Sequence, residues 1–211
     1  MTPDGIVSRG ADGVEEHHRT RGVPRTMRVY LAGWSDELRS ISRDEAVPIA
    51  LLLMTIATEN GPASIGDDLV RIPVRREPRY VDDETTPDQI SVGPCHPLLA
   101  TAREVMGDQA IDRGWLQVPA NNIRVAARYI RGRATVHGYD PILVAASYNA
   151  GSIRKSGANR WHLRSYGNHL DRAAAWYGDA CALLYETREL WSMDEAGLGR
   201  VGSPATLGVA V

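Results

Sequence analysis

The longest apolar segment of the chain reads Val47-Pro48-Ile49-Ala50-Leu51-Leu52-Leu53-Met54-Thr55-Ile56-Ala57-Thr58-Glu59, and the helix breakers Asn60-Gly61-Pro62 follow it. Leu52, Ile56 and Glu59 lie at positions i, i+4 and i+7, so a helix places the carboxyl on the same face as core residues. Because burial favours the neutral form of a carboxyl, this position predicts a raised pKa and a proton that Glu59 can donate near neutral pH. The alternative is a glutamate at a helix end that turns toward water.

The remaining pattern is typical of a mainly α protein. Ser42-Arg43-Asp44-Glu45 has the form of a capping box, which predicts that the helix ending at Glu59 begins at about Arg43. Pro48 then falls in the first turns, where proline is tolerated. Apolar residues at helical spacing predict further helices, and one alternating segment predicts a short strand. The helices are expected at about residues 97–106, 121–136, 141–149 and 168–190, and the strand at 69–74.

Length and composition are those of one globular domain. A chain of 211 residues that is 43% hydrophobic can bury one good core. The formal net charge of −2 gives no reason to expect nucleic acid as a partner. Cys95 and Cys181 are the two cysteines, and their number and spacing favour buried free thiols over a disulfide framework. The histidines show no metal-ligand spacing, so we expect no metal and no cofactor.

One part of the chain is locally basic. Residues 120–172 contain nine Arg or Lys against Asp140 and Asp171. Such a stretch can attract an anionic polymer, or it can be an ordinary solvated helix face, and the second interpretation is the more common one.

Two other segments stand in a fixed order after Glu59. Ser91-Val92-Gly93 forms a small-residue turn ahead of a short helix, and a second apolar helix ends in Tyr148-Asn149-Ala150-Gly151. A helix-ending Glu, a Ser-x-Gly turn and a Tyr-Asn-Ala-Gly helix end, in this order, resemble the lysozyme-like peptidoglycan lytic transglycosylases, the SLT-type domain. The resemblance covers roughly residues 43–180.

Further segments agree with this family, and two positions depart from it. The segment Trp115 to Ile123 resembles the Leu-x-x-Pro-x-x-Asn-Ile start of the family's next helix, and residues 159–166 resemble its late aromatic segment. The Leu-Met-Gln that follows the glycine in the family is Pro94-Cys95-His96 here, so His96 must supply the glutamine's substrate contact or that contact is absent. Asn60 replaces the serine that usually follows the catalytic Glu.

The resemblance implies a lysozyme-like fold with a small irregular or β region beside the active-site cleft. It also implies cleavage of the β-1,4 bond between N-acetylmuramic acid and N-acetylglucosamine by intramolecular transglycosylation. Glu59 would act first as acid and then as base, and the product would carry a 1,6-anhydro ring. Residues implied in substrate binding are Ser91, Gly93, His96, Tyr148, Asn149 and Tyr166, and Tyr166 is expected to hydrogen-bond Glu59.

Two alternatives stay open. A hydrolytic muramidase that inverts the anomeric carbon needs a second carboxylate to activate water. Asp82, Asp83, Glu84 and Asp88 are the candidates, although a solvated acidic turn is the favoured interpretation of these residues. A catalytically inactive wall-binding or virion structural module is the other alternative, because a fold does not determine an activity.

The chain divides on sequence into residues 1–30, a polar and flexible N-terminal arm, residues 31–192, a lysozyme-like catalytic domain, and residues 193–211, a C-terminal tail. Residues 1–26 lack the apolar stretch of a signal peptide, and no segment predicts membrane insertion. The expectation is synthesis in the cytoplasm and delivery as a phage lysin or a phage tail or baseplate component, with a secretion-system effector as the alternative. Peptidoglycan glycan strands, and phage tail or baseplate proteins, are the expected partners.

Overall fold

A computed structural model describes residues 6–9, 12–20, 25–60 and 73–187 of the chain. The protein is mainly helical, as expected, with two small two-stranded sheets. The helices are α1 (Arg25–Gly33), α2 (Ser35–Glu45), α3 (Ile49–Asn60), α4 (Leu99–Met106), α5 (Arg113–Gln117), α6 (Pro119–Gly132), α7 (Ala134–His137), α8 (Pro141–Ala150) and α9 (His169–Glu186), with a 3-10 turn η2 (Pro87–Gln89). The strands are β1 (Ile6–Arg9), β2 (Glu15–His18), β3 (Val74–Arg76) and β4 (Ile90–Val92).

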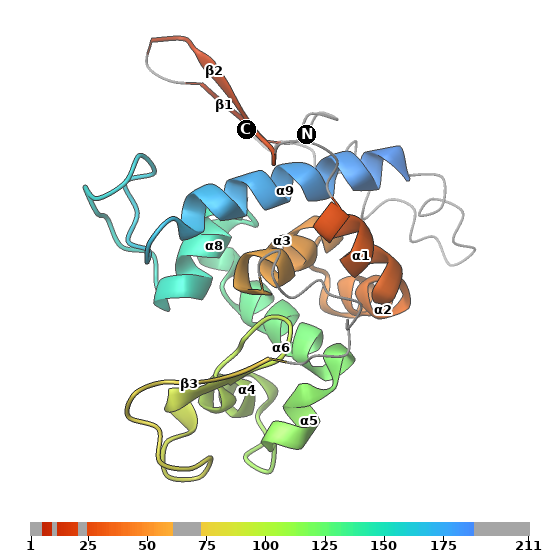
Figure 1. The fold of residues 1–211 in the computed structure, drawn as a ribbon, viewed down its shortest axis with the longest axis vertical. Coiled ribbons are helices and arrows are strands. Elements are labelled where there is room, and N and C mark those ends of the chain that lie inside the picture. Colours follow the sequence, from red (N-terminus) through yellow and green to blue (C-terminus); the bar gives the residue numbers. More distant parts are fainter. Residues whose placement is uncertain (1–5, 10–11, 21–24, 61–72, 188–211) are drawn as a thin grey trace.

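Helix α3 is the centre of the fold. Every residue from Ile49 to Thr58 is buried, and α9 packs along the helix while α1, α2, α6 and α8 contact its other sides (Figure 1). A fully buried Leu or Ile side chain stabilises a fold by about 1.5–3 kcal/mol. An apolar run of this length therefore dominates the core, and it positions whatever residue ends the helix.

The start of α3 differs from the sequence prediction. Ser42 to Glu45 are the last turn of α2, and Ala46 leaves the helix in the left-handed conformation with φ 53°. Proline disfavours helical backbone at the residue before it, so the chain breaks at Val47 and α3 begins at Ile49. The capping-box assignment is therefore wrong, because a Ser-x-x-Glu pattern also occurs inside helices that end.

Glu45 joins α2 to α6 through an ion-pair cluster. Its carboxylate, 5% exposed, lies 3.3, 3.0 and 3.4 Å from the guanidinium nitrogens of Arg124, Arg128 and Arg131. Arg124 also pairs with Asp44 at 3.2 Å. Three of the nine basic residues in the stretch 120–172 thus pair with acidic residues of α2, which favours the structural interpretation for that part of the stretch.

The other helices of the structure differ from the sequence predictions mainly at their ends. Residues 97–106 contain α4, 141–149 lie within α8, and 168–190 contain α9 as far as Glu186, with residues beyond 187 outside the described part. The helix expected at 121–136 is divided into α6 and α7 near Arg133. Of the strand expected at 69–74, residues 69–72 lie outside the described part, and Val74 opens β3.

A small β region lies at the end of the molecule opposite α9. Strands β3 and β4 pair antiparallel, with Val74 opposite Val92, and they lie with α4 and α5 below α6 (Figure 1). A separate apolar cluster fills this part, and its largest fully buried members are Ile90, Leu99 and Leu116. Helix α6 contacts both parts and so connects the β region to the main core.

The N-terminal arm is more structured than the sequence suggested. Strands β1 and β2 form an antiparallel hairpin that extends away from the helices (Figure 1). Its base is attached to α9, because the fully buried Asp179 accepts hydrogen bonds from the backbone and hydroxyl of Thr20 and lies 3.5 Å from the guanidinium of Arg19. Residues 25–30, which the sequence assigned to the arm, belong to α1, whose Met27 is completely buried. The tail at 193–211 lies outside the described residues.

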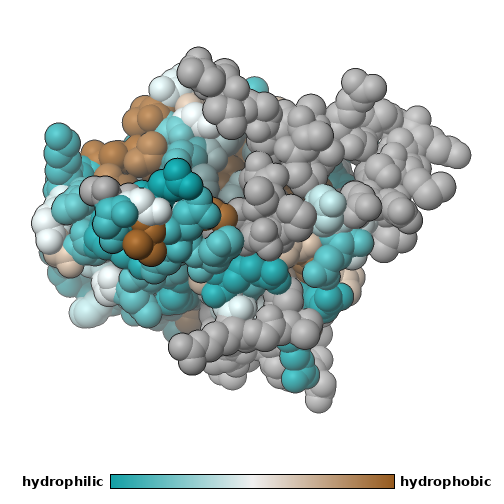
Figure 2. Space-filling model, turned by 90° about the horizontal axis from the view of Figure 1, so that it is seen from above, coloured by the Kyte–Doolittle hydropathy of each residue, from teal (hydrophilic) through white to brown (hydrophobic). Residues whose placement is uncertain are grey.

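The described surface seen from above is mostly polar (Figure 2). In the view from above, hydrophilic residues cover most of what is coloured, and apolar residues form small groups among them (Figure 2). Of the described helices, none combines the length and the apolar character that crossing a membrane requires.

Candidate functional site

Glu59 ends α3 with a carboxyl that is largely withdrawn from water. Its side chain is 19% exposed, and Leu52 and Ile56 on the same face are completely buried. Burial raises the pKa of Glu59 to about 7, against the partial opposition of the positive charges of Arg172 and Arg75. The sequence prediction of a shared apolar face and a raised pKa is confirmed. Near neutral pH such a carboxyl can both donate and accept a proton.

His169 of α9 lies close to this carboxyl. Its Nε2 lies 3.9 Å from Glu59 Oε1, which is too long for a hydrogen bond. Burial and the charge of Arg172 lower the pKa of His169 to about 4, and a hydrogen bond with the backbone of Ala145 opposes them. His169 is therefore neutral at pH 7 and provides no counter-charge to Glu59.

The turn at residues 91–96 is built around Asn122 of α6. Asn122 is completely buried, accepts a hydrogen bond from the backbone N–H of Cys95 at 2.9 Å, and donates to the carbonyl of Val92 at 2.7 Å. Gly93 has φ 80°, and a Cβ at this position would lie 2.2 Å from the Asn122 amide nitrogen. The glycine is thus required by the close approach of Asn122. The role in substrate binding that the resemblance implies for Gly93 is not needed to explain the glycine.

Ser91 has a structural position as well. It lies in β4, is 6% exposed, and pairs with Leu98 across an isolated bridge that closes the turn. A contact with substrate, as predicted, would require an exposed side chain, and that of Ser91 is buried. A structural role in the turn explains Ser91 better.

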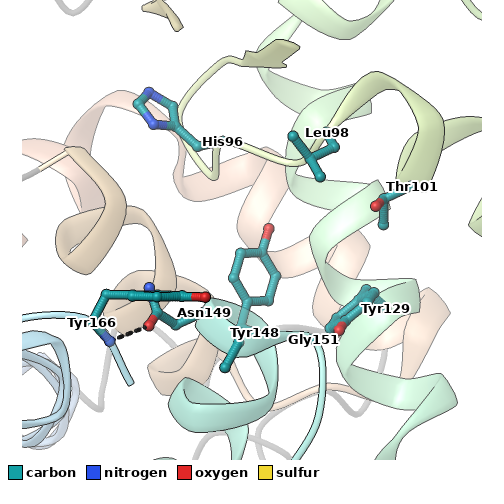
Figure 3. Close-up of a pocket in the computed structure, with 9 residues that line it drawn as sticks. His96, Leu98, Thr101, Tyr129, Tyr148, Asn149, Gly151 and Tyr166 are labelled. Carbon is teal, nitrogen blue, oxygen red and sulfur yellow. Dashed lines mark hydrogen bonds between the residues drawn. The ribbon is translucent and has the colours of Figure 1, made fainter. Parts of the chain in front are cut away.

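A pocket of about 310 Å³ opens between this turn and the end of α8 (Figure 3). His96, Leu98 and Thr101 lie on one side of it, Asn149 and Tyr166 lie on the other, and the ring of Tyr148 stands between them. Tyr129 of α6 contributes a further aromatic wall. Four of the six residues assigned to substrate binding, His96, Tyr148, Asn149 and Tyr166, therefore line one pocket.

Tyr148 connects the pocket to the turn and to Glu59. Its hydroxyl donates to the carbonyl of Cys95 at 2.9 Å, and its ring meets the edge of Tyr129 at a centroid distance of 5.3 Å. Burial, chiefly, and the charge of Glu59 raise the pKa of both Tyr148 and Cys95. Glu59 does not itself line the pocket, but its charge acts on two groups that form or support the pocket's wall.

His96 is the one pocket side chain with a buried ring nitrogen that has no hydrogen-bond partner among the described residues. Burial lowers its pKa to about 4, so the ring is neutral at pH 7. Its backbone has φ 48°, a left-handed conformation that is uncommon for residues other than glycine, and the chain changes direction there at the end of the turn. This free nitrogen is itself buried, so in this conformation it is not exposed to a molecule bound in the pocket.

Tyr166 does not contact Glu59 as the sequence led us to expect. Its backbone N–H donates to the side-chain oxygen of Asn149 at 2.9 Å, and its hydroxyl lies 3.5 Å from the guanidinium of Arg164. Its side chain is exposed, and no hydrogen bond between described residues joins it to Glu59. The prediction of that bond is wrong because Asn149 holds the backbone of Tyr166 on the outer side of the pocket.

Most of the candidate second carboxylates have structural partners. Asp82 accepts hydrogen bonds from the backbone N–H groups of Glu84 and Thr85, and these bonds lower its pKa. Asp83 accepts from Tyr80 and Arg113, and Glu84 pairs with Arg103 at 2.7 Å. Asp88 accepts a hydrogen bond from the side-chain amide of its neighbour Gln89 and from no other described residue. This favours the interpretation of the loop as a solvated acidic turn.

The cysteines add little chemistry to the site. Cys95 and Cys181 are both buried, and neither takes part in a disulfide, as the sequence favoured. Among the described residues, no group of three or more His, Cys, Asp or Glu side chains is arranged to bind a metal ion.

Sequence reasoning missed three residues at the site, His169, Arg172 and Tyr129. Each comes from a helix face that packs toward α3 or α8, and nothing in its local sequence separates it from other core-facing residues. Asn122 was part of a recognised motif, but the motif alone did not reveal that its amide holds the turn.

Comparison of the chain with protein-family models, with curated proteins and with solved structures found no match.

Proposed function

We propose that this protein is a lysozyme-like peptidoglycan-cleaving enzyme, and specifically a lytic transglycosylase in which Glu59 is the acid and the base. The observation that carries the proposal is the state of Glu59. It ends a buried helix, has a pKa raised to about 7, and acts electrostatically on groups that border an aromatic, hydrogen-bonding pocket. Titratable groups perturbed in this way beside a pocket are characteristic of acid–base catalysis.

The chemistry of glycosidic cleavage matches a single carboxyl with this pKa. The leaving oxygen must be protonated while positive charge builds at the anomeric carbon, and a neutral Glu59 can supply that proton. The resulting carboxylate can then accept the proton of the muramoyl 6-hydroxyl, whose oxygen attacks the anomeric carbon and closes the 1,6-anhydro ring. Glu59 thus donates one proton and accepts one proton, so it returns to its starting state. No water enters the product.

The pocket supports recognition of a sugar chain. Tyr129 and Tyr148 offer aromatic surface, which packs against the apolar faces of pyranose rings. The side-chain NH2 group of Asn149, whose oxygen is bonded to Tyr166, offers a hydrogen-bond donor to hydroxyls and acetamido groups. We infer that a glycan strand of peptidoglycan lies across this pocket with its scissile bond near Glu59.

The testing experiment is mass spectrometry of muropeptides released from purified peptidoglycan. Wild-type protein should release products one water lighter than hydrolytic products. Glu59→Gln should lower the rate by about 10²–10⁴-fold, the usual value of a positioned acid or base. Glu186→Gln, at the exposed far end of α9, is the matched control and should keep wild-type activity.

Other outcomes identify the alternatives. Reducing-end muropeptides would contradict transglycosylation and favour a muramidase, and Asp88, the acidic-loop carboxylate with the fewest structural partners, would be the first second carboxylate to replace. Binding to peptidoglycan without product release by the wild type would favour a non-enzymatic wall-binding module.

A further inference from the structure

The last turn of α3 is held from two sides. The final four carbonyl groups of a helix have no partner within the helix, and that of Thr58 is one of them. The guanidinium of Arg172 on α9 donates a hydrogen bond to the carbonyl oxygen of Thr58. On the other side, the side-chain amide of Asn60 donates to the carbonyl of Pro94 at 2.8 Å. Glu59 lies between these two anchored residues.

The groups that face Glu59 differ in charge. On α9 they are Arg172 and the neutral His169, and on β3 the charged group is Arg75. The turn contributes Cys95 and α8 contributes Tyr148, whose raised pKa values leave both uncharged at neutral pH. The end of α3 adds the partial negative charge of the helix dipole, which opposes ionisation of Glu59. Among the described residues, positive charge near Glu59 therefore comes from the two arginines.

The two arginines are not equivalent. Arg75 has a side chain that is 66% exposed and pairs with Glu77 at 3.0 Å, so solvent and its own partner weaken its effect. Arg172 is half-buried and bound to the residue that precedes Glu59. Its charge is also the larger of the two opposing influences on Glu59.

We propose that Arg172 is a positioning residue for Glu59, which holds the end of α3 in place and stabilises the ionised carboxylate. For catalysis this inference rests on the proposed function. After it has donated its proton, Glu59 must act as a base in its ionised form. Burial alone raises the free energy of that form. Arg172 provides the compensating charge without forming a direct ion pair that would keep Glu59 permanently ionised.

The direct test is a titration of Glu59 in the full chain by ¹³C-carboxyl NMR, with its signal assigned by its absence in Glu59→Gln. In Arg172→Gln the midpoint should move to higher pH by about one pH unit, because an adjacent positive charge is lost. Arg172→Lys keeps the charge and should titrate near the wild type. Arg28→Gln, which removes a surface pair with Glu186, is the control and should leave the midpoint unchanged.

Two results would overturn the inference. One is an unchanged midpoint in Arg172→Gln, and the other is a midpoint that rises equally in Arg172→Lys and Arg172→Gln. Since loss of the Thr58 bond could prevent Arg172→Gln from folding, Arg75→Gln provides a second test. Its midpoint should move less than one pH unit, and a full unit would assign the role to Arg75.

Activity separates this inference from the proposed function. If the wild type cleaves peptidoglycan, the alkaline limb of its pH profile should move upward in Arg172→Gln together with the NMR midpoint. A moved midpoint without cleavage by the wild type would contradict the proposed function and support the role of Arg172 toward Glu59. Cleavage by the wild type with an unchanged midpoint in Arg172→Gln would support the proposed function and contradict the role of Arg172.

Discussion

Glu45 and Glu59 both end helices, and both are largely buried, yet their surroundings differ. Glu45, 5% exposed, has three arginines of α6 within 3.4 Å and joins two helices. Glu59, 19% exposed, faces neutral His169 at 3.9 Å, and its pKa is raised to about 7. Burial by itself therefore does not determine how a carboxyl at a helix end is used. The charge of the neighbouring side chains decides whether a buried carboxylate is part of a salt bridge or remains free to exchange a proton.

The largest stability effect expected from this comparison is the pH dependence of Glu59. Its pKa is about 7 in the folded protein against an ordinary 4.5, so the folded state favours the protonated form. The stability that this group contributes is complete at low pH and is lost as pH rises from about 4.5 through 7. Glu59→Gln has no charge to bury. Its free energy of unfolding, relative to that of the wild type, should therefore increase by about 3 kcal/mol as the pH rises through this range.

Urea unfolding at about pH 4 and about pH 8 measures this difference. Glu186→Gln serves as the control and should show the same offset at both pH values. If the free energies of unfolding of Glu59→Gln and the wild type differ by the same amount at both pH values, the site does not destabilise the ionised carboxylate.

Glu45→Gln should act in the opposite direction. Removing the carboxylate leaves three arginines of α6 without their shared partner, and breaking a buried ion pair costs about 3–5 kcal/mol. Since these arginines are between 31% and 57% exposed, solvent reduces the cost, and we expect a loss of about 2 kcal/mol.

The measurement is the free energy of unfolding at neutral pH, with Arg28→Gln as a control for loss of a simple surface pair. A stabilised Glu45→Gln variant would place Glu45 in the same class as Glu59 and remove the contrast between the two residues.

The smallest expected effect concerns the link between the pocket and the turn. Tyr148→Phe removes the hydrogen bond from the phenol to the carbonyl of Cys95 and should cost about 1 kcal/mol of stability. Tyr129→Phe, which removes a bond to the carbonyl of Ser147, is a matched comparison on the facing ring. If the turn positions Glu59, the Glu59 titration midpoint should change in Tyr148→Phe and not in Tyr129→Phe.

Much of the fold could be predicted because its signals are local. The apolar run before Glu59, the proline-led start of α8 and the glycine after Ala150 specify helices within a few residues. The start of α3 was missed because the Ser42 to Glu45 pattern is compatible with either end of a helix, and the conformation of Ala46 decides between them. The basic stretch was ambiguous because the partner of its arginines, Glu45, lies about 80 residues away in sequence.

The amino-acid sequence predicted that Glu59, at the end of a buried helix, has a raised pKa, and it named His96, Tyr148 and Asn149, which line one pocket. Packing of distant segments settled the rest. Arg172 is 114 residues from Thr58, and Asn122 is 27 residues from Cys95. A helical period specifies which face of a helix is buried, but it does not specify which charges on another helix will meet that face. For this reason the surroundings of Glu59 became visible only after α9 was packed against α3.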